Sequence, residues 1–359
     1  MTDALRNSDG DLTSSNLVAR QVHLIERPGR LSDDLFRMVD APMRKLELGE
    51  VLVRNLYMSV DPYMRRSMEE TGVDLDPWPI GGPLDGPSVG VVELSRNPDF
   101  EEGDIVEGMS GWQSHFISDG TEFLPYLSPP GSIKKREAMP GVEPKDYVGI
   151  MGIASQTAYY GLFHATGRLP TSGTVVVSSA AGTVGSMICQ LAKNAGLRVV
   201  GSAGSDAKVT WLQESLGIEA FNYKIRDSSE ALSMLCPEGI DLLFENATPE
   251  HLSACLPLMN YGATVLIAGF ISIYDTGGRV DRVENFHFVL DRYLTLKAFA
   301  VTDYAEHYDA FVGHVTSLRR SGELQFREQI YEGLEKAPSA LCALFTGANA
   351  GKLLVRISE

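Results

Sequence analysis

A turn of small residues between Ala180 and Gly185 has the spacing of a loop that holds phosphate groups. The stretch VVVSSAAGTVGSMICQLAK reads as a strand at Val175 to Val177, a tight turn and then a helix. It differs by one residue from the G-x-G-x-x-G pattern, because alanine replaces the first glycine. Gly182 would let a pyrophosphate approach the backbone, and Gly185 would let the helix pack closely on the strand. The free N–H groups of the helix N-terminus would complete a dinucleotide site. The alternative is a turn that serves packing alone.

The end of the next strand indicates which dinucleotide fits. An NAD site places Asp or Glu about 20 residues after the glycines, where it binds the ribose 2′-hydroxyl. Here the stretch VVGSAGSDAK has Gly201 and Ser202 at that point, and Lys208 follows. A missing carboxylate beside an added cation favours a 2′-phosphate, so we predict NADPH as the cofactor, with Tyr223 and Lys224 completing the pocket. Alternatively, Lys208 and Lys224 are solvated residues of a helix and a loop.

This loop belongs to a segment in which strands and helices alternate. From Gly173 to about Val301, short apolar runs are followed by longer runs with apolar residues at helical spacing. Such repetition predicts a doubly wound α/β domain of the Rossmann type, a parallel sheet with helices on both faces. The expected helices span residues 184–195, 206–216, 228–235 and 250–259.

The regions on either side of this segment have a different pattern. From Val18 to about Ile133, runs of strand length are broken by Gly, Pro and Asp, which predicts an antiparallel β domain. A helix is expected after Tyr304 and ends near Ser321. The later run LLVRI again looks like a strand, so we expect the C-terminus to return to the first domain. The predicted division is a loose N-terminal tail at 1–17, a catalytic domain at 18–150 and 305–359, and a nucleotide domain at 151–304.

Composition and charge narrow the possible partners. The chain has 359 residues, more than one hydrophobic core usually supports, so two domains are expected. Its net charge of −16 repels phosphate backbones, so we predict no nucleic-acid partner. No apolar run has the length of a membrane span, and the N-terminus lacks the pattern of a signal peptide. Because the four cysteines also show no disulfide spacing, we expect a cytoplasmic protein without a membrane partner.

The sequence contains neither the pattern of a catalytic metal site nor that of a catalytic nucleophile. A catalytic zinc site in a dehydrogenase needs a Cys or His ligand early in the catalytic domain, but the first cysteine is Cys189. The seven histidines show no short ligand spacing, and the G-x-S-x-G pattern of a nucleophile elbow is absent. We therefore predict no catalytic metal.

Several stretches resemble one known family. The chain is similar to the medium-chain dehydrogenase/reductase superfamily, in particular to its zinc-free prostaglandin reductase and NADPH-dependent alkenal double-bond reductase branch. The resemblance runs from about Arg20 to the C-terminus. The matching stretches are NLYMSVDPYMRRSM, which is distinctive, GIMGIASQTAYYGL, AAGTVGSMICQLAK, VVGSAGSDAKVTWL, FNYK, GFISIY and GANAGKLLV.

The resemblance implies a GroES-like catalytic domain, a Rossmann domain and a homodimer. It also implies NADPH-dependent reduction of a carbon–carbon double bond conjugated to a carbonyl, by hydride delivery to the β-carbon. One departure is FENATPE, where FDNVGG is common in the family: Asn246 is kept and both glycines are lost. The positions that match the family's cofactor contacts are Gly182, Thr183, Val184, Gly185, Lys208, Tyr223, Asn246, Gly269, Tyr274, Phe299, Val301 and Asn349.

The implied reaction needs a particular donor. Hydride addition at the β-carbon places negative charge on the carbonyl oxygen, so a hydrogen-bond donor must face that oxygen. Tyr57 is the candidate catalytic residue, because a tyrosine hydroxyl donates without carrying charge. Tyr63, Tyr274 and Arg65 or Arg66 are candidate substrate contacts, and an arginine there would attract a carboxylate-bearing enone. The alternative is that Tyr57 is a buried anchor and the arginines are solvated.

These observations predict a cytoplasmic, homodimeric NADPH-dependent reductase. Its substrates would be small enones or enals of the 15-oxoprostaglandin or alkenal type. A quinone reductase would need the same cofactor site but a flatter, more aromatic pocket. A non-catalytic NADPH-binding protein would keep the turn and Lys208 without turnover, and the fold alone does not separate these functions.

Overall fold

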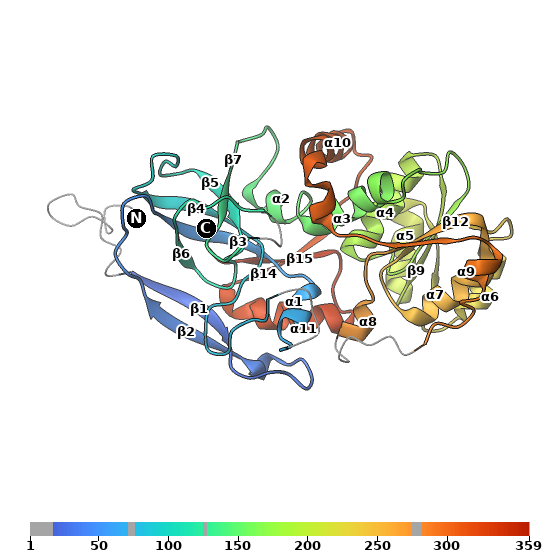
Figure 1. Cartoon of the computed structure of the whole chain (residues 1–359), viewed down its shortest axis with the longest axis horizontal. Helices are drawn as coiled ribbons and strands as arrows, with labels where there is room; N and C mark the ends of the chain where they lie inside the picture. The colour runs from blue at the N-terminus through green and yellow to red at the C-terminus, as the bar shows by residue number, and fades with distance from the viewer. Residues whose placement is uncertain (1–16, 71–75, 125–127, 275–281, 359) are drawn as a thin grey trace. The chain divides into compact units, whose positions relative to one another are not determined.

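The chain forms two compact units in a computed structural model (Figure 1), which describes residues 17–70, 76–124, 128–274 and 282–358. The first unit combines Met1–Gly152 with Glu328–Ala348 and Leu353–Glu359, and the second combines Ile153–Arg327 with Asn349–Lys352.

The segment 305–327 groups with the second unit, whereas the sequence placed it in the catalytic domain. Its helix α10 (Tyr308–Ser321) packs on α3 (Ile153–Tyr160) through aromatic side chains. The ring of Phe311 lies 5.3 Å from that of Tyr159, in edge contact. The chain therefore returns to the first unit at Glu328.

The second unit is built on a six-stranded sheet with strand order β10-β9-β8-β11-β12-β13. All five neighbouring pairs are parallel. Counted along the chain this is the dinucleotide-binding order, with its reversal between β8 and β11, so the predicted Rossmann domain is confirmed. The strands are β8 (Thr174–Val177), β9 (Arg198–Ala203), β10 (Glu219–Asn222), β11 (Ile240–Glu245), β12 (Met259–Ile267) and β13 (Thr295–Ala298).

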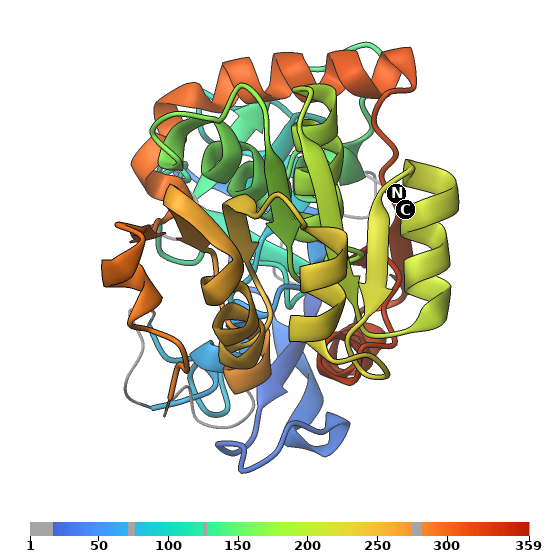
Figure 2. The same ribbon diagram turned by 90° about the vertical axis from the view of Figure 1, so that its right-hand side faces the viewer.

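Helices cover both faces of this sheet (Figure 2). Their starts follow local sequence signals: the side chains of Ser205, Asp227 and Thr248 each accept a hydrogen bond from the backbone of the helix that follows. Besides α3 and α10, the helical segments are η3 (Gly161–Ala165, a π-helix), α4 (Thr183–Asn194), α5 (Asp206–Leu216), α6 (Ser228–Leu235), α7 (Pro249–Cys255), η4 (Leu256–Leu258), α8 (Ile271–Tyr274), α9 (Phe288–Asp291) and η5 (Val301–His307).

The first unit is built around strand β3 (Val51–Ser59), which pairs antiparallel with β4, β6 and β15. The predicted antiparallel domain is confirmed, and so is the return of the C-terminal strand, β15 (Lys352–Arg356). The other strands are β1 (Val18–Leu24) and β2 (Phe36–Pro42), which form a sheet of two, and β4 (Ser88–Ser95), β5 (Ile105–Gly108), β6 (His115–Ser118), β7 (Ile133–Arg136) and β14 (Glu328–Glu332).

Short helices complete the first unit, and most of them were not expected from the sequence. All of them except the helix Pro144–Val148 contribute residues to a core that also contains Trp78 and Trp112. Helix α11 (Ala337–Thr346) buries Ala337, Ala340 and Leu341 at helical spacing, on one face. The helices are η2 (Asp33–Leu35), α1 (Tyr63–Ser67), α2 (Pro144–Val148), η6 (Leu334–Lys336) and α11 (Ala337–Thr346).

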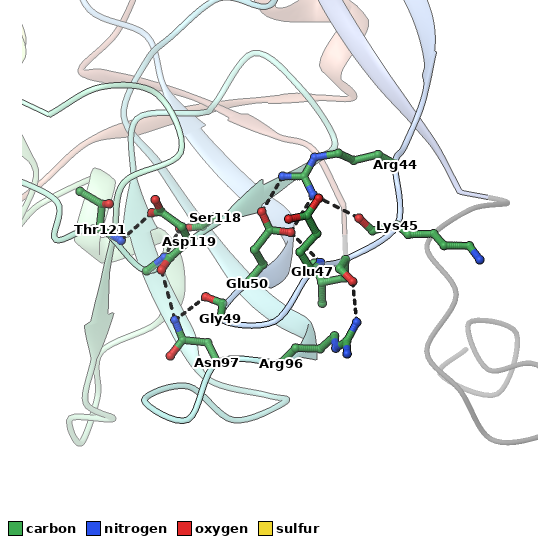
Figure 3. A network of polar contacts seen from close by, with 12 residues as sticks. Arg44, Lys45, Glu47, Gly49, Glu50, Arg96, Asn97, Ser118, Asp119 and Thr121 are labelled. Carbon is green, nitrogen blue, oxygen red and sulfur yellow. Dashed lines mark hydrogen bonds and ion pairs between the residues drawn. The ribbon is translucent and has the colours of Figure 1, made fainter.

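A polar network holds the loop that leads into β3 (Figure 3). The Arg44 guanidinium donates to both oxygens of Glu50, at 2.7 and 2.6 Å. Glu50 also accepts from the backbone N–H of Glu47 at 2.8 Å. The side-chain amide of Asn97 donates to the carbonyl of Gly49 at 2.8 Å. These contacts fix the position at which the central strand begins.

This network predicts a pH-dependent contribution of Glu50 to stability. The hydrogen bond from Arg44 is the main cause that lowers the pKa of Glu50. A lowered folded-state pKa means that the stabilisation is present at neutral pH and is lost as the pH falls through it. We expect Glu50→Gln to reduce the free energy of unfolding by about 0.5–1 kcal/mol at neutral pH, because Arg44 is largely exposed.

The measurement is urea denaturation at neutral pH and below the ordinary glutamate pKa of about 4.3. The deficit of Glu50→Gln should shrink at the acidic pH. Glu26→Gln removes an exposed glutamate of the same unit and serves as the control. A deficit equal to that of the control, or one that does not change with pH, contradicts the prediction.

Candidate active site

The turn between β8 and α4 leaves backbone N–H groups open to a ligand. Ser179 adopts a left-handed conformation, with φ of 49°, and its carbonyl accepts from the N–H of Gly182 at 2.9 Å. A Cβ at Gly185 would clash with that carbonyl and lie 2.7 Å from Ala180 Cα, so no larger residue fits. No side chain caps the helix, and the N–H groups of Thr183 to Gly185 lack partners in the preceding turn. The geometry suits a pyrophosphate.

The loop after β11 is hydrogen-bonded to this turn, at the point where the strand order reverses. The backbone N–H of Asn246 donates to Ser178 Oγ at 2.7 Å, and its side-chain amide donates to the carbonyl of Ser178 at 3.3 Å. The backbone N–H groups at the end of β12, including that of Gly269, point to the carbonyl of Glu245. A Cβ at Gly269 would lie 2.7 Å from the hydroxyl of Tyr274, so the absence of a side chain at this position leaves room for that hydroxyl.

The departure FENATPE has a structural explanation. The buried carboxylate of Glu245 accepts from the N–H groups of Ala247 at 2.7 Å and Thr248 at 3.0 Å, and from His251 Nδ1 at 2.7 Å. Burial alone would lower the pKa of His251, but Cys255 and the Glu245 carboxylate raise it well above its usual value. The carboxylate therefore holds the turn that follows Asn246 through hydrogen bonds.

A group of cations lies where β9 and β10 end. A Cβ at Gly204 would lie 2.9 Å from the hydroxyl of Tyr223 and 3.4 Å from Lys224 Cε, so both side chains lie against this glycine. Lys208 is in the first turn of α5, and its pKa is lowered by burial and then by the charges of Lys224 and Arg327. Burial raises the pKa of Tyr223, which keeps its hydroxyl protonated. Such a pocket favours an anion.

A cavity of about 510 Å³ opens beside these residues, within the second unit. Its volume is in the range of small-molecule sites. Ser202 Oγ and His251 Nε2 are buried there, without a hydrogen-bond partner among the described residues. The sequence indicated Ser202 only as the place of a missing carboxylate, whereas its unpaired hydroxyl makes it a cofactor candidate. The walls also include Tyr223, Arg226, Ala247, Thr248, Glu250 and Arg282.

The remaining cofactor candidates lie in the same unit. A Cβ at Gly161 would lie 2.8 Å from the Phe299 ring, which shows how closely this aromatic side chain packs on the π-helix. Val301 is buried, and the side-chain amide of Asn349 donates to the carbonyl of Gly351 at 3.3 Å. All twelve cofactor candidates are thus in the second unit. Their roles stay predictions.

The catalytic candidate Tyr57 is in the first unit, on β3. Its hydroxyl oxygen accepts from Arg356 Nε at 3.0 Å, and the Arg356 guanidinium lies 5.5 Å from the ring centroid. The two residues face each other across the β3–β15 pair. Because Arg356 donates, the hydroxyl keeps its own proton for another acceptor. The half-buried Tyr57 can therefore act as a hydrogen-bond donor.

The other candidates of this unit, Tyr63, Arg65 and Arg66, lie on α1. Arg65 is 1% exposed and ion-paired with Glu69. The alternative that Arg65 is a solvated residue is therefore wrong. Its charge already faces a carboxylate, and the attraction of an acidic substrate by Arg65 stays a prediction. Tyr63 and Arg66 are half-buried.

The described residues contain neither a metal-binding cluster nor a membrane-spanning helix. Over 17–70, 76–124, 128–274 and 282–358, no three His, Cys, Asp or Glu side chains are grouped to hold a metal ion. In the same part of the chain, no helix has both the length and the apolar character of a membrane span.

Two family models match the chain. The N-terminal domain of oxidoreductase matches residues 20–125, and the zinc-binding dehydrogenase model matches residues 183–316. The second match begins at Thr183, the first residue of α4, and includes Lys208, Tyr223 and Lys224.

Known proteins align with nearly the whole chain. The 2-alkenal reductase (NADP(+)-dependent) of Nicotiana tabacum is 37% identical over 87% of this chain and 88% of its own length. Prostaglandin reductase 1 of Bos taurus is 34% identical over 90% of this chain and 94% of its own length. The crystal structure of CurA from Vibrio vulnificus in complex with NADPH has a TM-score of 0.86 at 32% identity, covering 95% of this chain and 99% of that one.

The matching turn, the strand order and these alignments lead to one conclusion. The chain belongs to the medium-chain dehydrogenase/reductase superfamily, in its family of zinc-free prostaglandin reductases and NADPH-dependent alkenal double-bond reductases.

Proposed function

We propose that this protein uses NADPH to reduce the carbon–carbon double bond of α,β-unsaturated ketones or aldehydes. It is an NADP-dependent oxidoreductase by family. The observation that carries the cofactor assignment is the pocket of Lys208, Lys224 and Tyr223 beside an uncapped helix N-terminus. Ser202 replaces the carboxylate that would repel a 2′-phosphate, and its buried hydroxyl supplies a further polar group.

The chain's own residues bind and orient the reactants. Bound NADPH supplies the hydride that adds to the β-carbon of the substrate. The π-electrons move to the carbonyl oxygen, which becomes an enolate oxygen and needs a donor. Tyr57 donates its proton to a hydrogen bond with this oxygen, while Arg356 holds the hydroxyl from the other side. Tyr63, Arg65 and Tyr274 are proposed substrate contacts.

The reaction class can be tested directly with purified protein. NADPH consumption is followed by absorbance with a 15-oxoprostaglandin, a long-chain alkenal, a cyclic enone and a quinone, and each assay is repeated with NADH. We expect turnover of an enone or enal with NADPH preferred, and a product saturated between the α- and β-carbons by mass spectrometry. Turnover of the quinone alone, or binding of NADPH without turnover, would overturn the proposed reaction.

Tyr57→Phe tests the proposed donor. Loss of one hydrogen bond to a developing oxyanion lowers kcat on the order of 10²-fold, and we expect a loss of this size with the best substrate of the panel. The affinity for NADPH, measured by fluorescence titration, should stay near that of the unmodified protein.

A matched variant separates this role from structural damage. Tyr331 belongs to the same unit, and its hydroxyl is a hydrogen-bond partner of Gln329 at 3.3 Å. Tyr331→Phe removes this hydroxyl and should leave kcat unchanged. If Tyr57→Phe keeps the same kcat as Tyr331→Phe, Tyr57 is a structural residue.

We also propose that the protein is a cytoplasmic homodimer. Strand β13 is at the edge of the six-stranded sheet, where its backbone groups can pair with a second copy. The apolar side chains of Tyr261, Leu290 and Tyr293 are each at least 66% exposed, and the rings of Tyr261 and Tyr293 lie 5.0 Å apart. The four cysteines are free thiols, as in a reducing compartment.

Light scattering coupled to size exclusion tests the assembly. We expect a mass twice the 39.1 kDa of one chain. Tyr293→Asp places a charge beside the strand edge and should shift the mass toward the monomer. Leu48→Asp changes an even more exposed apolar residue of the first unit and should have no effect. A monomeric mass for the unmodified protein would refute the dimer.

A further inference from the structure

We infer that Arg327 is a third cation of the 2′-phosphate pocket and helps the enzyme to select NADPH over NADH. This inference rests on the proposed function, in which Lys208 and Tyr223 bind the phosphate.

The side chain of Arg327 is placed on the same face of α5 as Lys208. Its guanidinium lies 4.8 Å from the ring centroid of Trp211. Trp211 follows Lys208 by three residues, and residues at this spacing are neighbours on one face of a helix. A guanidinium stacked on an aromatic ring keeps its N–H edge open for a bidentate contact to phosphate oxygens.

The backbone before Arg327 is fastened to two helices of the second unit. The N–H of Gln325 donates to Gln190 Oε1 at 2.7 Å, and Gln190 Nε2 donates back to the carbonyl of Gln325 at 3.0 Å. The Gln325 side chain donates to the carbonyl of Ser215, at the end of α5, at 3.2 Å. On the other side, the N–H of Lys352 donates to the carbonyl of Arg327 at 2.8 Å. An anchored backbone reduces the entropy cost of ordering this side chain on a ligand.

Electrostatics support the same assignment. Burial lowers the pKa of Lys208, and the charges of Lys224 and Arg327 lower it further, so the three cations lie close enough to repel one another. Within the described residues, Arg327 forms no ion pair with a carboxylate, although the chain carries a net charge of −16. An anion with two negative charges would offset this repulsion. A cofactor without the 2′-phosphate would not.

The test measures cofactor affinity and not turnover. Dissociation constants for NADPH, NADH, adenosine 2′,5′-bisphosphate and adenosine 5′-monophosphate are determined by calorimetry for the unmodified protein and for Arg327→Ala. We expect Arg327→Ala to weaken the two ligands with a 2′-phosphate by roughly tenfold, as for the loss of one charge-assisted contact. The two ligands without it should bind as before. Arg327→Lys keeps the positive charge but lacks the planar guanidinium. It should weaken the two ligands with a 2′-phosphate less than Arg327→Ala does.

Three companion variants define the comparison. Lys208→Ala should show a loss of the same selective kind. Arg320→Ala removes one exposed positive charge from α10 in the same unit, and reports the effect of net charge alone. Trp211→Leu removes the ring that positions the guanidinium and should weaken NADPH less than Arg327→Ala does. Arg327 is exposed, so Arg327→Ala should fold, which thermal unfolding will check.

The possible outcomes distinguish a failure of the role of Arg327 from a failure of the proposed NADPH-dependent function. If the unmodified protein binds NADPH no more tightly than NADH, the cofactor assignment fails and this inference fails with it. If Lys208→Ala is selective but Arg327→Ala behaves like Arg320→Ala, only the role of Arg327 is overturned. Equal weakening of all four ligands by Arg327→Ala would indicate a structural residue and would also overturn it.

Discussion

The close approach of α4 to the turn after β8 is the constraint on which the nucleotide unit depends. No Cβ fits at Gly185, because the carbonyl of Ser179 and the backbone of Ala180 occupy that space. This contact sets where the helix begins, and so where its free N–H groups point. The same turn is tied to β9, since the N–H of Ala180 donates to the carbonyl of Ser202 at 2.8 Å. One packing contact therefore positions both the N–H groups proposed to bind the pyrophosphate and Ser202, which stands at the place of the usual carboxylate.

Local signals in the sequence were sufficient for most of this unit. Helix α5 spans the predicted residues, because Ser205 caps its start and Gly217 ends it with φ of 62°. The assignment of α10 failed for a different reason: an amphipathic pattern tells that one face is buried but not which unit covers it. The same limit applies to predicting the cation pocket from the sequence. Lys208 follows the turn of small residues at a short spacing, whereas Arg327 is distant in sequence and reaches α5 through tertiary contacts, its own with Trp211 and that of Gln325 with Ser215.

The turn after β11 is held by hydrogen bonds to a buried carboxylate. Glycines would allow the chain to turn at Asn246 through backbone freedom. Here a fully buried carboxylate does so by hydrogen bonds, since Glu245 accepts from two backbone N–H groups, from Ser178 and from His251. A buried carboxylate is costly unless its oxygens are satisfied, and these four donors meet that requirement. The sequence alone does not reveal these hydrogen bonds, because the donors lie on three different elements.

The site in the first unit depends on the direction of one hydrogen bond. A tyrosine hydroxyl has one proton, and a buried acceptor next to it would use that proton in the free enzyme. Arg356 has no acceptor, so it donates to the oxygen of Tyr57 and leaves the proton for another acceptor, which in the proposed reaction is the substrate oxygen. The arrangement needs β15, the C-terminal strand, to pair with β3 in a register that sets these two residues opposite each other. The return of the C-terminus to the first unit thus has a chemical consequence: it supplies the cation that orients the proposed donor.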